Sequence, residues 1–341
     1  MTRWPAVLGP SENEERILWV AWEIQRRNQS VAKRLGARLL EIHGVGTSRL
    51  GRYVRSTYET VAMALRFRPD AIIAANPSVV LATVAVLLGR ALRRPVLLDT
   101  HNAGIEPVVG GIVADALATL LARGADVTVI HNDDLVESVR KRGGRPFVLP
   151  DPVPDLPAAA PSEIGTFKGR CNVFYICTYD VDEPYLEVME AGRLLPPDVH
   201  IYVSGRRSEL LTRANPPANV IPTGYLSEAD YVRALRAADV VMALTTLDRC
   251  ALCGAYEAVS AGKPMVLTGT STLRHIFSRG AVFTENDARR IAGAIDEALR
   301  RKSELSSEAI ALRTDLEARW GERLSGLQEL LRELSRSSRE D

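Results

Sequence analysis

The sequence is poor in cysteine and has no excess of charge of either sign. Its four cysteines, Cys171, Cys177, Cys250 and Cys253, are too few to form a disulfide scaffold in 341 residues. We therefore expect reduced thiols and a cytoplasmic protein. The 43 basic and 42 acidic residues leave a net charge of +1. Because nucleic-acid binding needs a basic surplus, we expect no nucleic-acid partner.

Long hydrophobic runs are also missing. The most apolar stretch, 79–88, is about half the roughly 20 residues that a membrane-spanning helix needs. The N-terminal segment 1–16 lacks the basic start and apolar core of a secretory signal. This absence weighs against one alternative, a two-lobed binding protein of the periplasmic type.

Nucleotide and hydrolase motifs are missing as well. No G-x-G-x-x-G follows an apolar run, which disfavours a dinucleotide cofactor. The P-loop pattern and the G-x-S-x-G elbow are also absent, which excludes a P-loop NTPase and weighs against an α/β-hydrolase.

What the sequence does contain is an alternation of apolar strands with amphipathic helices. This alternation predicts parallel sheets covered on both faces. The predicted strands cover 17–22, 37–42, 71–75, 95–98, 127–130, 147–149, 172–177, 200–203, 240–244 and 264–267. The predicted helices include 29–35, 228–237 and 288–300.

Five prolines in 150–161 interrupt this alternation. Proline fixes φ and lacks an amide donor, so this stretch predicts a linker. We expect an N-terminal Rossmann-like domain (1–152), a Pro-rich hinge (153–168), a C-terminal Rossmann-like domain (169–310), and a C-terminal helix and tail (311–341). The tail either packs back across both halves or forms a dimer helix.

Ligands of open α/β folds bind where the strands end. Polar residues gather at these predicted ends: Glu23, Asn76, Asp99, His101 and Asn102 in the first half, and Thr178–Glu183, Gly205–Arg207, Thr245–Arg249 and Thr268–Thr270 in the second.

The stretch 250–267, CALCGAYEAVSAGKPMVL, carries Glu257-Ala258 followed by Gly262-Lys263-Pro264. It resembles the C-terminal half of GT-B glycosyltransferases, especially family 4 ("group 1"). Gly224-Tyr225-Leu226 and Ala238-Asp239-Val240 are similar to two further segments of that family. The resemblance covers most of 172–300. It implies an α/β protein of the GT-B fold, with two Rossmann-like domains whose parallel sheets face a central cleft and a C-terminal helix crossing back. The resemblance also implies that 1–152 is the acceptor domain and 169–310 the nucleotide-sugar domain.

The resemblance also implies a donor site. Glu257 would accept hydrogen bonds from the ribose hydroxyls, with a carboxylate favoured by the helix dipole as its alternative role. Leu252, Cys253 and Gly254 open the helix whose amides would hold the diphosphate. Arg249 stands where the family has a glutamate, with Asp248 beside it. The family's basic residues are missing from 178–183, so Arg206, Arg207 or Arg249 would supply that charge.

In the N-terminal half, the candidate acceptor-binding residues are Arg26, Arg27, Asn28 and Asn102. Arginine matches phosphate oxygens with two hydrogen bonds, although a solvated basic loop is the alternative. The candidate catalytic residues are His101, Asp99 and Glu23. By resemblance His101 would lie against the donor sugar, and it could act as general base if the reaction inverts; the alternative is a structural histidine.

Two further patterns suggest metal sites. Asp180-x-Asp182 matches a divalent-metal motif of the other glycosyltransferase fold, GT-A. The alternative is that Asp182, Glu183 and Pro184 start the next helix, with a carboxylate cap and proline in the first turn. Cys250-x-x-Cys253 has no second ligand pair, so we interpret both cysteines as packing residues. We expect no metal and no cofactor, because the nucleotide-sugar is the substrate.

Together these observations predict a metal-independent glycosyltransferase that moves a sugar from a nucleotide-sugar to a polysaccharide- or lipid-linked acceptor. The arginines at 49, 52, 55, 66, 68, 90, 93 and 94 suggest peripheral contact of the N-terminal domain with the cytoplasmic membrane face, or else an ordinary solvated face. The alternatives are a non-catalytic GT-B partner subunit, which the Arg249 departure favours, and a nucleotide-sugar epimerase of the same fold. Donor base and sugar, stereochemistry and oligomeric state stay open.

Overall fold

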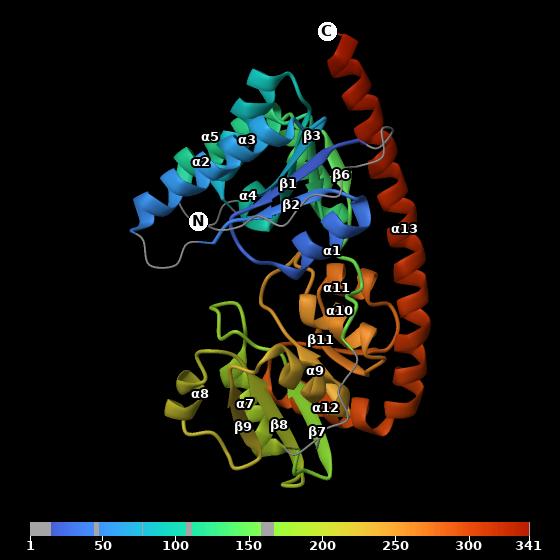
Figure 1. Ribbon diagram of the computed structural model, residues 1–341. Helices are drawn as coiled ribbons and strands as arrows, with labels where there is room; N and C mark the ends of the chain where they lie inside the picture. Colours follow the sequence, from blue (N-terminus) through green and yellow to red (C-terminus); the bar gives the residue numbers. More distant parts are fainter. Residues whose placement is uncertain (1–14, 44–47, 77, 107–110, 158–166, 341) are drawn as a thin grey trace. The chain divides into compact units, whose positions relative to one another are not determined.

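The computed structural model describes residues 15–43, 48–76, 78–106, 111–157 and 167–340 (Figure 1). The chain divides into two compact units. The first unit combines Met1–Pro150 with Trp320–Asp341, and the second is Asp151–Arg319. Each unit contains a six-stranded sheet in which every strand pair is parallel. The prediction of an α/β protein with two parallel sheets is confirmed.

The sheet of the first unit has the order β2-β1-β3-β4-β5-β6. Its strands are β1 (Ile17–Ala21), β2 (Arg38–Glu41), β3 (Ala71–Asn76), β4 (Val96–Thr100), β5 (Val127–Ile130) and β6 (Pro146–Val148). Alternation of side chains sends Leu18 and Val20 into one apolar cluster and Ile17 and Trp19 into another, so both faces of the sheet are buried.

Helices of the first unit cover these two faces. Met63, Leu81 and Leu121 bring α2, α3 and α5 onto the Leu18 face. Val31 of α1 and Leu327 of α13 pack on the Trp19 face. The helices are α1 (Arg26–Leu35), α2 (Arg49–Phe67), α3 (Val79–Leu92), α4 (Asn102–Ile105), α5 (Gly111–Gly124), the 3₁₀ turn η1 (Asp133–Leu135) and α6 (Val136–Lys141).

The sheet of the second unit has the order β12-β11-β10-β7-β8-β9. Its strands are β7 (Cys171–Tyr175), β8 (Val199–Ser204), β9 (Val220–Gly224), β10 (Val240–Ala243), β11 (Met265–Thr268) and β12 (Ala281–Thr284). Its helices are α7 (Tyr185–Leu194), α8 (Glu209–Arg213), α9 (Glu228–Ala237), α10 (Cys253–Ser260), α11 (Ser271–Ile276) and α12 (Ala288–Arg300).

The long C-terminal helix α13 (Lys302–Glu340) contributes side chains to the cores of both units. Leu305 and Leu312 belong to clusters of the second unit, whereas Trp320 and Leu331 belong to a cluster of the first. This burial accounts for the regular leucines of the charged tail.

Several elements differ from their predicted bounds. The first helix starts at Arg26 rather than at residue 29, so Arg26, Arg27 and Asn28 form its first turn instead of a loop. The short helices α4, α8 and α11 and the strand β12 were not predicted, because each has six residues or fewer and little periodicity. Residues 158–166 of the predicted hinge lie outside the described residues. Among the described residues, no helix is long and apolar enough to span a membrane.

Candidate functional site

Each sheet has one topological switch point, where successive strands change from being added on one side of the sheet to being added on the other. In open α/β sheets ligands bind at such a point, beyond the carboxyl ends of the strands. In the first unit this point lies between β1 and β3, and in the second between β7 and β10. The sequence places its polar strand ends at both points, so each unit has its own candidate site.

At the switch point of the second unit, hydrogen bonds join the two diverging loops. The Thr245 hydroxyl donates to a carboxylate oxygen of Asp182 (2.7 Å), and the Thr246 amide donates to the Asp182 carbonyl (2.7 Å). The Thr245 carbonyl accepts from the Asn286 side-chain amide (2.8 Å). Thr245 is fully buried, so these contacts fix the loop after β10 to its neighbours.

Glu257 lies in helix α10, which begins just after this loop. The residue is 9% exposed, and its carboxylate accepts a hydrogen bond from the phenol of Tyr231 on α9. Leu252 is the N-cap of α10 and makes no side-chain capping hydrogen bond. Cys253 and Gly254 belong to the first turn, the end of the helix that favours a negatively charged group. The predicted donor residues Leu252, Cys253, Gly254 and Glu257 therefore share one helix start.

The loop after β7 holds a carboxylate of its own. Glu183 accepts from the amide and hydroxyl of Thr178 (2.7 and 2.9 Å), the amide of Asp180 (3.0 Å) and the thiol of Cys177 (3.5 Å). Burial, with the nearby Glu183 charge, raises the pKa of the Cys177 thiol well above its usual range. The Glu183 carboxylate thus occupies the backbone amides of Thr178 and Asp180, which could otherwise donate hydrogen bonds to an anionic ligand.

This arrangement corrects one sequence interpretation. Asp182 and Glu183 do not cap helix α7, because Pro184 is the N-cap residue and makes no side-chain cap. Asp180 forms an ion pair with Arg207 (3.0 Å), while Asp182 accepts from Thr245. The two carboxylates of the D-x-D pattern therefore have different partners.

The basic candidates lie on two loops. Arg206 and Arg207 follow β8, and the guanidinium of Arg206 stacks on the Tyr225 ring at 3.9 Å. Gly205 before them has φ +124°, and a Cβ there would lie 2.5 Å from a backbone oxygen. Arg249 follows β10 and has a left-handed backbone with φ 57°, so the predicted position of the family glutamate is a sharply turned loop.

Asp248 lines a cavity of about 770 Å³ beyond the ends of β11 and β12. Its other polar walls include Thr270, Arg274, Asn286 and Arg290. The predicted donor residues thus do not all lie together. Asp248 lines this cavity, Arg249 lies in the loop after β10, Arg206 and Arg207 follow β8, and the other four lie in α10 or at its N-cap. The packing interpretation of the two cysteines is wrong for Cys253, because its side chain is exposed.

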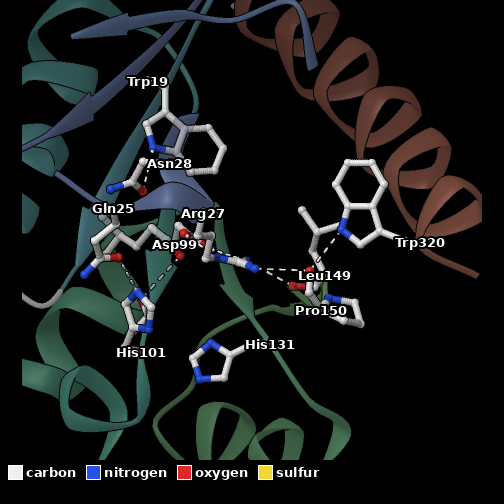
Figure 2. Close-up of polar contacts among 12 residues, drawn as sticks. Trp19, Gln25, Arg27, Asn28, Asp99, His101, His131, Leu149, Pro150 and Trp320 are labelled. Atoms are coloured by element: carbon white, nitrogen blue, oxygen red, sulfur yellow. Dashed lines mark hydrogen bonds and ion pairs between the residues drawn. The ribbon is translucent and has the colours of Figure 1, made fainter. Parts of the chain in front are cut away.

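In the first unit, Arg27 and Asp99 form a buried ion pair (Figure 2). Two nitrogens of Arg27 donate to the two oxygens of Asp99, at 3.0 and 2.8 Å. Arg27 also donates to the carbonyls of Leu149 (3.0 Å) and Pro150 (3.1 Å). Burial by itself would raise the pKa of Asp99, but the Arg27 charge and hydrogen bonds outweigh it, so the pKa is lowered. Both side chains are therefore engaged with each other.

His101 lies beside this pair and contacts a glutamine (Figure 2). The side-chain amide nitrogen of Gln25 donates to the Glu23 carboxylate (2.5 Å). The side-chain oxygen of Gln25 therefore faces Nε2 of His101, at 3.2 Å. Nε2 must then carry a proton to donate. The structure thus links Glu23 to His101 through Gln25. The ring of His131 lies 5.1 Å from that of His101.

The remaining predicted acceptor residues differ in exposure. Asn28 is fully buried and accepts a hydrogen bond from the indole of Trp19 (3.2 Å), whereas Arg26 is exposed. Asn102 is within hydrogen-bond distance of Nε2 of His131, at 3.0 Å.

A cavity of about 390 Å³ opens at the switch point of the first unit. Trp22 and Glu23 after β1, the first two turns of α2 and the start of α3 form its walls. Arg49 and Arg52 line it, and neither side chain has a hydrogen-bond or ion-pair partner among the described residues. The rings of Trp22 and Tyr53 lie 6.1 Å apart beside them. This cavity combines cationic and aromatic groups, which suits a sugar that carries an anionic group.

Sequence reasoning missed His131 and the cavity role of Arg49, Arg52 and Tyr53. His131-Asn132 follows β5 as His101-Asn102 follows β4, so the strand-end rule applied to β5 would have found it. The arginines were noted only as surface charge, because helix α2 had no visible link to the end of β1.

No protein-family model and no curated protein matches the sequence. Solved structures do match the fold. Anabaena HepE in complex with UDP-glucose has a TM-score of 0.70 and 16% identity, covering 92% of this chain and 100% of HepE. Sucrose-phosphate synthase from Thermosynechococcus elongatus has a TM-score of 0.70 and 12% identity, covering 95% of this chain and 100% of the synthase.

A Listeria monocytogenes protein named as a UDP-N-acetylglucosamine 2-epimerase has a TM-score of 0.61 and 12% identity, covering 87% of this chain and 91% of that one. At these identities the likeness establishes the fold alone. It confirms the predicted GT-B fold class of two Rossmann-like units.

Proposed function

We propose that this chain is a glycosyltransferase that uses a nucleotide-sugar donor. The observation that carries the proposal is the fold match over nearly the whole length of both chains to HepE, whose structure contains UDP-glucose. Membership of family 4 and independence of metal are parts of the same proposal, carried over from the sequence resemblance.

The donor would bind at the end of the second sheet. One carboxylate oxygen of Glu257 accepts a hydrogen bond from the Tyr231 phenol. The carboxylate would also accept hydrogen bonds from the ribose hydroxyls. The amides at the start of α10 would face the diphosphate, where a helix N-terminus favours negative charge. Arg206 or Arg249 would supply the cation, while Arg207 is paired with Asp180.

The acceptor would bind to the first unit. The cavity lined by Arg49, Arg52 and Tyr53 supports an acceptor that combines a sugar with an anionic group, as in a polysaccharide- or lipid-linked intermediate. His101 is our candidate general base, oriented by Gln25. We place the protein in the cytoplasm, in peripheral contact with the inner membrane face through its first unit.

Calorimetric titration with UDP, GDP, ADP and CMP tests the proposal, with and without magnesium. We expect one nucleotide to bind without metal and Glu257→Gln to weaken it about ten- to a hundredfold, since a hydrogen bond to a charged group contributes about 1.5–3 kcal/mol. Glu187→Gln, an acidic residue in the first turn of α7, is the matched control and should bind normally. If no nucleotide binds, the proposal fails and a non-catalytic partner subunit explains the fold.

The second candidate function is epimerisation of a nucleotide-sugar, which the Listeria likeness favours. An epimerase changes the donor without an acceptor. Proton NMR of UDP-N-acetylglucosamine incubated with the protein alone separates the two functions. A second anomeric signal supports the epimerase, and an unchanged donor that binds supports the transferase.

A further inference from the structure

Helix α5 exposes several large apolar side chains to solvent. It buries Ala118, Leu121 and Ala122, but Ile112 is 90% exposed and Leu120 is 64% exposed. A surface helix normally turns its large apolar residues toward the core. The outward face of α5 therefore has the character of a binding surface.

Helices α2 and α3 repeat this pattern. Leu50, Val54 and Tyr58 are spaced by four residues on α2, so they form one exposed stripe, while Ser56 and Thr60 point inward. The three helices lie side by side on the same face of the first sheet (Figure 1). We call their outward apolar side chains the apolar surface: Leu50, Val54, Tyr58, Leu65, Val79, Val80, Leu87, Ile112, Val113, Leu117 and Leu120.

Exposed large apolar side chains are concentrated on the apolar surface. Its eleven side chains are most of the eighteen large apolar side chains that are exposed among the described residues. An exposed apolar patch of more than a few hundred Å² marks a site of interaction with a protein or a membrane.

Positive charge accompanies the apolar surface. Helices α2, α3 and α5 contain six arginines and only two carboxylates, although the whole chain is nearly neutral. Both carboxylates are already paired, Glu59 with Arg55 (2.7 Å) and Asp115 with Arg142 (2.6 Å). Arg66 and Arg90 have no ion-pair partner in the part of the chain that the structure describes.

We propose that the apolar surface docks on an anionic lipid bilayer, with its apolar side chains inserted at the level of the headgroups. Apolar insertion and arginine–phosphate attraction act together in such binding. A second copy of this chain is a poorer occupant, because a symmetric interface would bring arginines against arginines with no free carboxylate to offset them.

Docking also bears on the acceptor. Val79 and Val80 belong to the apolar surface and line the cavity that contains Arg49 and Arg52. Docking brings this cavity to the headgroups, where the anionic end of a membrane-borne acceptor would enter it. The bilayer contact thus specifies the membrane contact of the proposed function, and the entry of the acceptor rests on that function, whereas vesicle binding can be measured without it.

Vesicle co-sedimentation of the full-length protein tests the contact. The vesicles are phosphatidylcholine alone, and equal parts of phosphatidylcholine and phosphatidylglycerol. We expect binding to the anionic vesicles that weakens as salt is added. The combined variant Val54→Ser, Ile112→Ser, Leu120→Ser should bind at least about tenfold more weakly, because each replacement removes apolar area from the contact.

Two further variants complete the test. Arg66→Gln with Arg90→Gln should weaken binding to anionic vesicles and flatten its salt dependence. The matched control Val181→Ser, Leu186→Ser, Leu194→Ser changes exposed apolar residues of the second unit and should bind as the unaltered protein does. Far-ultraviolet circular dichroism checks that each variant folds.

Three results would overturn the proposal. They are absence of binding to anionic vesicles, equal binding by the Val54 combination, and a dimer in sedimentation velocity that this combination converts to a monomer. Nucleotide titration of the same variants keeps the proposals apart. Vesicle binding without nucleotide binding supports the docking surface and counts against the glycosyltransferase.

Discussion

Replacing Asp99 by asparagine tests the buried ion pair of the first unit most directly. The exchange keeps the shape of the side chain but leaves the Arg27 side chain, 5% exposed, without its counter-charge. Breaking a buried pair from one side costs about 3–5 kcal/mol, because the remaining charge is no longer compensated. For a unit of about 170 residues this corresponds to a fall in Tm of about 6–20 °C.

Tryptophan fluorescence during thermal unfolding measures this loss in the right unit. The second unit, residues 151–319, has no tryptophan in its sequence, whereas Trp19, Trp22 and Trp320 lie in the first unit. The matched control is Asp115→Asn, which removes the exposed ion pair with Arg142 and should cost less than about 1 kcal/mol. If Asp99→Asn unfolds at the same temperature as this control, the ion pair does not stabilise the unit as we argue.

The pH dependence follows from the same pair. The pKa of Asp99 is lowered in the folded unit, so its stabilisation is complete above the unfolded pKa near 3.8. It is lost as the pH falls through the lower folded value. The difference in Tm between the unaltered protein and Asp99→Asn should therefore be constant near neutral pH and shrink on acidification below about pH 4.

Three further outcomes are expected. Gly205→Ala should destabilise the second unit by more than about 1 kcal/mol, because the residue has φ +124° and the added Cβ would lie 2.5 Å from a backbone oxygen. Urea unfolding measures this loss, and an unchanged midpoint would contradict it. Tyr231→Phe should weaken nucleotide binding less than Glu257→Gln does, since it removes only the group that holds the carboxylate; titration that ranks them in the opposite order would count against this role. Cys253 is exposed, whereas burial raises the pKa of the Cys250 thiol to about 11. A thiol reagent at neutral pH should therefore modify Cys253 before Cys250, which peptide mapping can verify.

Much of the fold follows from the sequence because both sheets are parallel and buried on both faces. Such strands read as continuous apolar runs, so 127–130 was predicted with its observed bounds. Regular amphipathic helices such as α9 and α12 were also predicted at their observed residues. Short elements such as α11 were not, because one or two turns carry too little periodicity.

The candidate site was harder to predict, since it depends on tertiary partners. Arg27 and Asp99 were both named from the sequence, but not as partners, because they are 72 residues apart. Glu183 was read as a helix cap, and only the folded loop reveals the amides of Thr178 and Asp180 around it. Residue type and strand-end position identified these groups, and packing decided what they contact.

The hydrogen bond between the Trp320 indole and the Pro150 carbonyl (3.0 Å) joins the point where the chain leaves the first unit to the point where it returns. In terms of chain connectivity, the second unit is an insertion into the first. Sites where a chain leaves and re-enters a domain side by side tolerate exchange of the inserted segment. The first unit should thus fold as a single chain with 151–319 replaced by a short glycine-rich linker, whereas removal of 320–341 would take out part of its own core.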